Sequence, residues 1–297
     1  MSFQQHPEQK HPQRSLSSVR TPRRLGADEQ VDDKALVLPP GGWALFDPFL
    51  MMAEDWFSAV GFDWHPHRGI ETVTFVLEGQ LEHRDNRGGH GVLGPGDAQW
   101  MTAGEGIIHS ERALEGRPVH TLQLWVNLPA AEKLTAAGYQ DLKGDRMPVA
   151  VGPGVQARVF SGRSGEVEGP ARNHVPVTML DVRMEAGARF AQALPAGDGG
   201  FVYVLEGEGR FGPEGQAVRQ GQVGHFSPGA ERDGVSELGA VADRPLRFLL
   251  FSGRPLREPV VSYGPFVMNT REQIVQAFQD YQQGKFGAVP ARAESVY

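Results

Sequence analysis

A repeat of domain length is the feature that most constrains the fold of this chain. The stretch FVLEGQLEHRDNRGGHGVLGPGD contains Gly79, and FVYVLEGEGRFGPEGQAVRQGQVGHFSPG repeats its pattern around Gly207, 128 residues later. Both stretches place short apolar runs between glycines and prolines, which is typical of β-strands joined by tight turns. A repeat of this length is too long for a solenoid, so it predicts two similar β-domains in tandem.

The rest of the sequence supports an all-β fold and suggests where the domains meet. The chain has 38 Gly and 22 Pro in 297 residues, enough for many turns and short strands. The polar residues 1–22 are expected to form a flexible tail. Small and charged residues in AAEKLTAAGYQDLKGDRM interrupt the strand pattern, so we predict one domain over residues 23–145 and a second over residues 146–297.

One short helix is expected near the end of the second domain. Thr270 and Gln273 have the spacing of a capping box, and Gly284 stands where a helix-ending glycine belongs. Between them, four apolar residues lie on one helical stripe, which should pack against a sheet: Ile274, Val275, Phe278 and Tyr281.

Charge and composition exclude several classes of function. Lys and Arg total 29 against 36 for Asp and Glu, a net charge of -7, so direct nucleic-acid binding is not expected. The chain has neither a long apolar run nor an apolar leader, which predicts a cytoplasmic protein without membrane contact. It also has no cysteine, so any bound metal must be held by His, Asp or Glu.

Two histidines at the head of a predicted strand indicate where such a metal would bind. His65 and His67 are two residues apart and therefore project from the same side of an extended strand. Continued alternation would place Glu71, Val73 and Phe75 on that side too. A bulge at residues 68–69 would reverse this phase.

A second pair of ionisable residues has the same spacing. His109 and Glu111 are two residues apart in the run GIIHSE, and Ile107 shares their predicted side. Burying an unpaired neutral polar group costs roughly 2–7 kcal/mol. A divalent cation, which accepts both imidazole nitrogen and carboxylate oxygen, would offset that cost and explain the group.

These residues resemble the signatures of the cupin superfamily and, more narrowly, of the pirin family. His65, His67, Glu71 and Gly79 match the first cupin motif, although Gly79 comes one residue later than usual. The stretches FDPFLMM, HPHRGIETVTFVLEG, GDAQWMTAGEGIIHSE and GPFVMNT are similar to pirin sequences. The resemblance implies two tandem cupin domains, each a jelly-roll β-barrel.

The resemblance also implies a metal site in the first domain. Its ligands would be His65, His67, His109 and Glu111, with Glu71 as a supporting partner or an alternative oxygen donor. Fe²⁺ is the expected ion, although the same donors hold Mn, Ni, Cu or Zn.

Counting along the repeat leaves the second domain without ligands. The positions that correspond to the five first-domain residues are Ala193, Pro195, Gly199, Gly234 and Ser236. His225 is expected to be a hydrogen-bonded structural residue of this domain.

For function, the resemblance implies oxidative ring opening of flavonols such as quercetin by O₂, with Glu111 or Glu71 as the base. The alternative is a non-catalytic, iron-containing redox sensor that binds a transcription factor or a metabolic enzyme. In either case a monomer is expected. Aromatic residues before the first histidine pair are candidates for a wall around a flat substrate: Phe46, Phe49, Trp56, Phe57, Phe62 and Trp64. Arg68 and Gln99 would either orient a polar edge of the substrate or form an exposed salt bridge or a turn contact.

Overall fold

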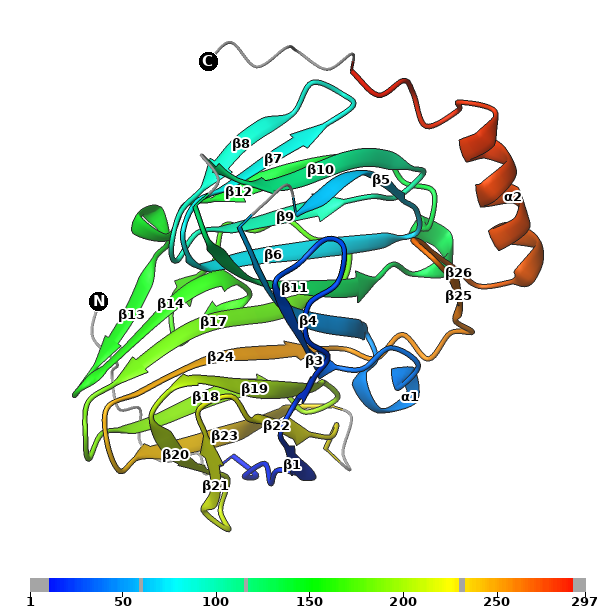
Figure 1. Ribbon diagram of the computed structural model, residues 1–297. Coiled ribbons are helices and arrows are strands. Elements are labelled where there is room, and N and C mark those ends of the chain that lie inside the picture. Colours follow the sequence, from blue (N-terminus) through cyan, green and yellow to red (C-terminus); the bar gives the residue numbers. More distant parts are fainter. Residues whose placement is uncertain (1–10, 59–60, 115–116, 230–232, 291–297) are drawn as a thin grey trace. The chain divides into compact units, whose positions relative to one another are not determined.

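The computed structural model describes residues 11–58, 61–114, 117–229 and 233–290 (Figure 1). The chain consists mostly of β-strands, as the sequence predicted, and divides into two compact units. Within the described residues, unit 1 comprises residues 11–23, 42–48 and 144–256, and unit 2 comprises residues 24–41, 49–143 and 257–290. Among the described residues, no helix has the length and apolar character that a membrane crossing requires.

Unit 2 is built from two antiparallel sheets and a C-terminal addition. In order of pairing, its seven-stranded sheet contains β12 (Gly138–Leu142), β9 (Ala98–Thr102), β6 (Ile70–Glu78), β11 (Val119–Asn127), β4 (Phe49–Phe57), β3 (Asp33–Leu38) and β2 (Arg23–Arg24). The four-stranded sheet contains β5 (Phe62–His67), β10 (Ile107–Ala113), β7 (Leu81–Asp85) and β8 (His90–Leu93). The addition contains the 3₁₀ turn η2 (Ala130–Glu132), the hairpin β25 (Val261–Tyr263) and β26 (Phe266–Met268), and helix α2 (Arg271–Gln282).

Unit 1 repeats this arrangement. Its seven-stranded sheet contains β1 (Ser18–Arg20), β22 (Val223–Phe226), β19 (Gly199–Glu206), β24 (Leu246–Gly253), β17 (Val177–Met184), β14 (Val155–Ser161) and β13 (Val149–Gly152). The four-stranded sheet contains β18 (Arg189–Pro195), β23 (Val235–Ala242), β20 (Glu208–Phe211) and β21 (Gln216–Arg219). Smaller elements are α1 (Trp43–Phe46), η3 (Gly144–Arg146), β15 (Arg163–Ser164) and β16 (Val167–Glu168).

The glycine that ends the repeated Leu-Glu-Gly motif has the same structural role in both units. Gly79 and Gly207 both have φ +77°, a backbone conformation that side chains disfavour. A Cβ atom would lie 2.2 Å from the carbonyl oxygen of Pro118 at Gly79, and 2.1 Å from that of Pro245 at Gly207. Each turn therefore excludes any side chain, which explains why the motif recurs.

The division into units differs from the predicted domains at both ends of the chain. Residues 11–22 were expected to be flexible, but β1 pairs with β22, and Arg14 is buried with hydrogen bonds to unit 1. The prediction for residues 1–10 lies outside the described residues. The C-terminal helix was assigned to the second domain, yet residues 257–290 belong to unit 2 with the metal-site residues. Both ends return to a sheet far away in sequence, which local composition does not reveal.

Helix α2 begins and ends as predicted, but its buried stripe differs. The Thr270 side chain accepts from the backbone N–H of Gln273, and the reciprocal capping-box bond is also present. Ile274 is buried, whereas Val275 is 56% exposed, and Ala277 is buried instead. The helix packs against Phe266 and Met268 of the hairpin rather than against a whole sheet. Its buried stripe is therefore narrower than predicted.

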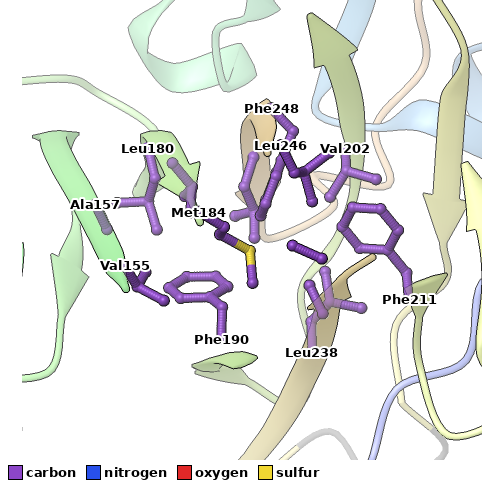
Figure 2. Packing of buried hydrophobic residues seen from close by; sticks show 14 of the residues in the cluster. Val155, Ala157, Leu180, Met184, Phe190, Val202, Phe211, Leu238, Leu246 and Phe248 are labelled. Carbon is purple, nitrogen blue, oxygen red and sulfur yellow. The ribbon is translucent and has the colours of Figure 1, made fainter. Parts of the chain in front are cut away.

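The interior of unit 1 is apolar. Figure 2 shows side chains from both of its sheets pointing toward one another, with the Met184 sulfur beside Phe190 and with Leu238 facing Phe211. The cluster includes 22 buried residues, and the labelled side chains all belong to it.

Candidate metal centre

Three histidines converge inside unit 2. Strands β5 and β10 are antiparallel neighbours, and their register sets His65 opposite His109 and His67 opposite Ile107. Because alternate residues of a strand project to the same side, all three imidazoles share one side of the sheet. One nitrogen from each ring lies within 4.8 Å of the others. Two ligands of one metal ion lie about 3–4 Å apart, so small ring rotations would complete the set.

Each of these rings is held through its Nδ1 atom. His65 Nδ1 donates to the carbonyl oxygen of Asp63 at 2.8 Å, and His67 Nδ1 donates to that of Pro265 at 3.3 Å. His109 Nδ1 lies 2.9 Å from Nε2 of His83. The Nε2 atoms therefore remain available, and Nε2 of His109 is buried without a hydrogen-bond partner among the described residues.

Burial favours the neutral form of all three imidazoles. Burial lowers the pKa of His65, and burial together with the neighbouring His65 lowers the pKa of His67 to about 3. Burial lowers the pKa of His109 well below its ordinary value, and His65 and His67 lower it further. A neutral imidazole keeps a lone pair for a metal ion, so the three rings are in the correct state to bind one.

Glu111 lies on the same strand as His109 but does not join the nitrogen group. Among the described residues, the cluster with metal-ligand spacing contains the three histidines alone. Glu111 is buried and accepts a hydrogen bond from Thr74 at 2.9 Å, and a register shift separates it from His109. Burial raises the pKa of Glu111 to about 7 despite the Thr74 hydrogen bond. Its role as a fourth ligand stays a prediction.

Glu71 faces away from the histidines, contrary to the predicted alternation. Thr74 contacts Glu111, and Thr72 pairs with Trp125, whose ring lies 5.0 Å from that of His67. Even-numbered residues of β6 therefore face the site, and Glu71 projects to the opposite side, where it accepts a hydrogen bond from Thr102 at 2.8 Å. The phase reverses after His67, as a bulge at residues 68–69 would require.

Two residues that sequence reasoning missed contact the histidines. Trp125 packs edge-on against His67, and His83 touches His109. Each faces inward on a strand by simple alternation, Trp125 two residues after Gln123 and His83 two after Leu81. This two-residue spacing could have predicted that both side chains face inward, but neither residue belongs to a recognised motif.

Of the six residues predicted to form an aromatic wall, one contacts a histidine of the cluster and two pack on other histidines. Phe62 lies 6.2 Å from His65 between ring centres, whereas Trp56 stacks on His120. Phe46 belongs to unit 1 and stacks on His225 at 4.6 Å. His225 is buried, and its Nε2 has no hydrogen-bond partner among the described residues, so the expected hydrogen bond is missing at that nitrogen.

The corresponding strands of unit 1 carry different side chains. Gln192 on β18 faces Leu238 on β23 as His65 faces His109, and Leu194 and Leu238 lie in the apolar cluster of Figure 2. Counting along the repeat had pointed to Ala193 and Pro195, but the buried positions of β18 are the alternate ones. Apolar packing thus occupies the interior of this unit.

The side chains in unit 2 fit a divalent transition-metal ion. Three imidazoles offer the nitrogen donors that such ions accept, and the buried residue Glu111 stands two positions after His109 on the same strand. The buried Nε2 of His109 lacks a partner among the described residues, and a metal ion would supply one. Residues His65, His67 and His109 would hold the ion.

Known proteins are similar to this chain along most of its length. A family model described as Pirin matches residues 43–126, and one described as Pirin C-terminal cupin domain matches residues 179–287. Pirin-1 of Arabidopsis thaliana is 43% identical over 246 residues, which cover 82% of this chain and 84% of that protein.

Solved structures are similar to this chain as well. A quercetin 2,3-dioxygenase from Acinetobacter baumannii has a TM-score of 0.81 at 29% identity, covering 93% of this chain and 99% of its own. A Geobacillus kaustophilus protein has a TM-score of 0.82 at 46% identity, covering 84% of this chain and 100% of its own. The chain, with two cupin domains and a histidine cluster in one of them, therefore belongs to the pirin family.

Proposed function

We propose that this protein is a metal-dependent dioxygenase that opens the ring of flavonols such as quercetin with O₂. The observation that carries the proposal is the convergence of His65, His67 and His109, with the buried residue Glu111 two positions after His109 on the same strand. The similarity to a quercetin 2,3-dioxygenase supports this choice of substrate class.

A bound divalent ion, for which we propose Fe²⁺, would supply the Lewis acidity and the electron transfer that bring an aromatic enol and dioxygen together. Neutral imidazoles contribute no charge to the site. The positive charge of an ion held there would therefore favour a deprotonated substrate hydroxyl. Binding of that anion requires a group that takes the proton.

Glu111 is the proposed proton acceptor. Its carboxylate faces the same interior as the histidines, and Thr74 holds one of its oxygens at 2.9 Å. The Thr74 hydroxyl also lies 2.6 Å from Oε1 of Gln123, and its contact with the carboxylate limits the orientation of Glu111. A general base must be placed within reach of the proton that it removes, and this anchoring provides that placement.

Trp125 and Phe62 are the proposed contacts for a flat substrate. Their rings lie 5.0 Å from His67 and 6.2 Å from His65, respectively. Aromatic faces at this distance exclude water from a site and stack with planar ligands.

The test is to load purified protein with Fe²⁺, measure the bound metal, and follow the loss of quercetin absorbance with and without O₂. We expect oxygen-dependent loss that disappears in His67→Ala together with the bound metal. Glu111→Gln keeps an acceptor for Thr74 but cannot take a proton, so its turnover should fall by about 10²–10⁴-fold. Glu71→Gln is the matched control, because Glu71 projects to the opposite side of β6.

Two results would count against the proposal. Wild-type protein that binds iron but turns over none of a panel of flavonols would refute dioxygenase activity. That outcome would favour the alternative of a metal-containing regulatory protein. Equal losses in Glu71→Gln and Glu111→Gln would refute the assignment of the base.

A further inference from the structure

His83 is a buried histidine in unit 2 that lies outside the metal-ligand group. It is 1% exposed and stands on β7, whose register against β10 sets it opposite Glu111. Its Nε2 lies 2.9 Å from Nδ1 of His109. Its Nδ1 has no hydrogen-bond partner among the described residues.

The hydrogen bond between Nε2 of His83 and Nδ1 of His109 contains a single proton, which is bonded to one of the two nitrogens. If Nε2 of His109 offers its lone pair to an ion, the proton of that neutral ring must be on Nδ1. His109 then donates to His83, so Nε2 of His83 must be unprotonated. The opposite arrangement, with a proton on Nε2 of His83, would place the proton of His109 on Nε2 and block it as a ligand.

His109 differs in this respect from the other two histidines. His65 and His67 donate to the backbone carbonyl oxygens of Asp63 and Pro265. A carbonyl can only accept, so each of those rings has its tautomer set by the backbone. The tautomer of His109 depends instead on a side chain that can be either donor or acceptor.

We propose that His83 is a positioning residue for the metal. Its Nε2 accepts the Nδ1 proton of His109 and thereby fixes the tautomer and the ring orientation that present Nε2 of His109 to the ion. The inference rests on metal binding by the three histidines, which is part of the proposed function, and is independent of the substrate. Partners of this kind affect affinity because they orient the ligand and raise its basicity.

The test compares two substitutions of nearly equal length in the full-length protein. In His83→Gln the amide oxygen can replace Nε2 as acceptor, whereas His83→Met places no strong acceptor there. Titration with Co²⁺ in the absence of flavonol measures affinity, and the visible spectrum reports ligand geometry. We expect His83→Met to lose about 10–100-fold in affinity and to change the spectrum. His83→Gln should recover most of the affinity and the wild-type spectrum.

His90 provides the control position. It lies on the neighbouring strand β8 and pairs with Glu82, and its side chain is 55% exposed. His90→Met and His90→Gln should leave the Co²⁺ affinity unchanged. Near-ultraviolet circular dichroism checks that each variant is folded.

Two outcomes overturn the proposal: a folded His83→Met that binds Co²⁺ like the wild type, or a folded His83→Gln that binds as weakly as His83→Met. If the methionine variant does not fold, ¹⁵N NMR of Zn²⁺-loaded wild type decides. The expected spectrum shows protons on Nδ1 of both His83 and His109, and a proton on Nε2 of His83 contradicts the proposal. Loss of flavonol turnover alone bears on the proposed function and not on this one.

Discussion

Asp280 on helix α2 links the C-terminal segment to Arg68, which follows His67 in the sequence. Its carboxylate accepts from Arg68 at 2.8 Å, from Lys285 at 2.7 Å and from Gln276 at 2.8 Å. Arg68 also donates to the carbonyl oxygen of Glu105 at 2.7 Å. Arg68 therefore forms an ion pair, but a sheltered one rather than the exposed salt bridge that was expected.

The contribution of each Asp280 ion pair to the free energy of unfolding depends on how exposed its side chains are. The side chains of Arg68 and Asp280 are 9% and 13% exposed, whereas Lys285 is 55% exposed. A sheltered hydrogen bond to a charged group contributes about 1.5–3 kcal/mol, and an exposed ion pair about 0–1 kcal/mol. Asp280→Asn should therefore lower the free energy of unfolding of unit 2 by about 2–3 kcal/mol at pH 7.

Low pH should remove the difference in the free energy of unfolding between wild type and Asp280→Asn. The side chains of Lys285, Arg68 and Gln276 hold the pKa of Asp280 well below its ordinary value. The folded-state pKa is depressed, so the contribution is complete above the unfolded pKa of about 3.9 and is lost as pH falls through the folded pKa. The gap between wild type and Asp280→Asn should stay constant above about pH 5 and narrow below about pH 4.

The assay is urea unfolding followed by tryptophan fluorescence. Four of the five tryptophans lie in unit 2 and report on it: Trp56, Trp64, Trp100 and Trp125. Lys285→Met is the control, because it keeps the Arg68 pair and should lose less than about 1 kcal/mol. A deficit below about 0.5 kcal/mol for Asp280→Asn at pH 7, or one that persists unchanged at the lowest pH where wild type is folded, would refute the reasoning.

Two further predictions concern unit 1. Gly207→Ala should cost about 3 kcal/mol or more, because it adds a backbone clash to an unfavourable φ. Gly221→Ala, at φ +74° with open space around it, should cost only about 1–2 kcal/mol, and equal losses in urea unfolding would contradict this account. Arg14→Met should lower the free energy of opening residues 12–20 by about 1.5–3 kcal/mol, because it removes hydrogen bonds from a buried guanidinium. Hydrogen exchange of that segment measures the change, and unaltered exchange would show that Arg14 does not hold it.

Local patterns were enough to predict the strands, the repeated glycine turn and the limits of α2. Each depends on residues close together in the chain, such as Thr270 and Gln273 at the helix start. The histidine group was also predictable, because the two-residue spacing within each pair survives in any regular strand.

The side on which Glu71 projects was not predictable from alternation alone. Gly69 has φ +78°, and a Cβ there would lie 2.1 Å from the carbonyl oxygen of Val267. The chain turns at this point beside a strand that lies almost 200 residues further along. Such a contact leaves no local trace, and one irregular residue reverses every side chain that follows. Likewise, the contacts of His67 with Pro265 and of His109 with His83 depend on the pairing of separate strands, which no local pattern predicts.

The hydrogen bond from His67 to Pro265 has a consequence for biosynthesis. A ribosome makes the three histidines long before it makes residue 265, and early segments fold while later ones are still being added. During that interval the His67 ring lacks the carbonyl that restrains it. Firm binding of an ion by all three histidines would then have to wait until residue 265 has been made and has docked beside His67.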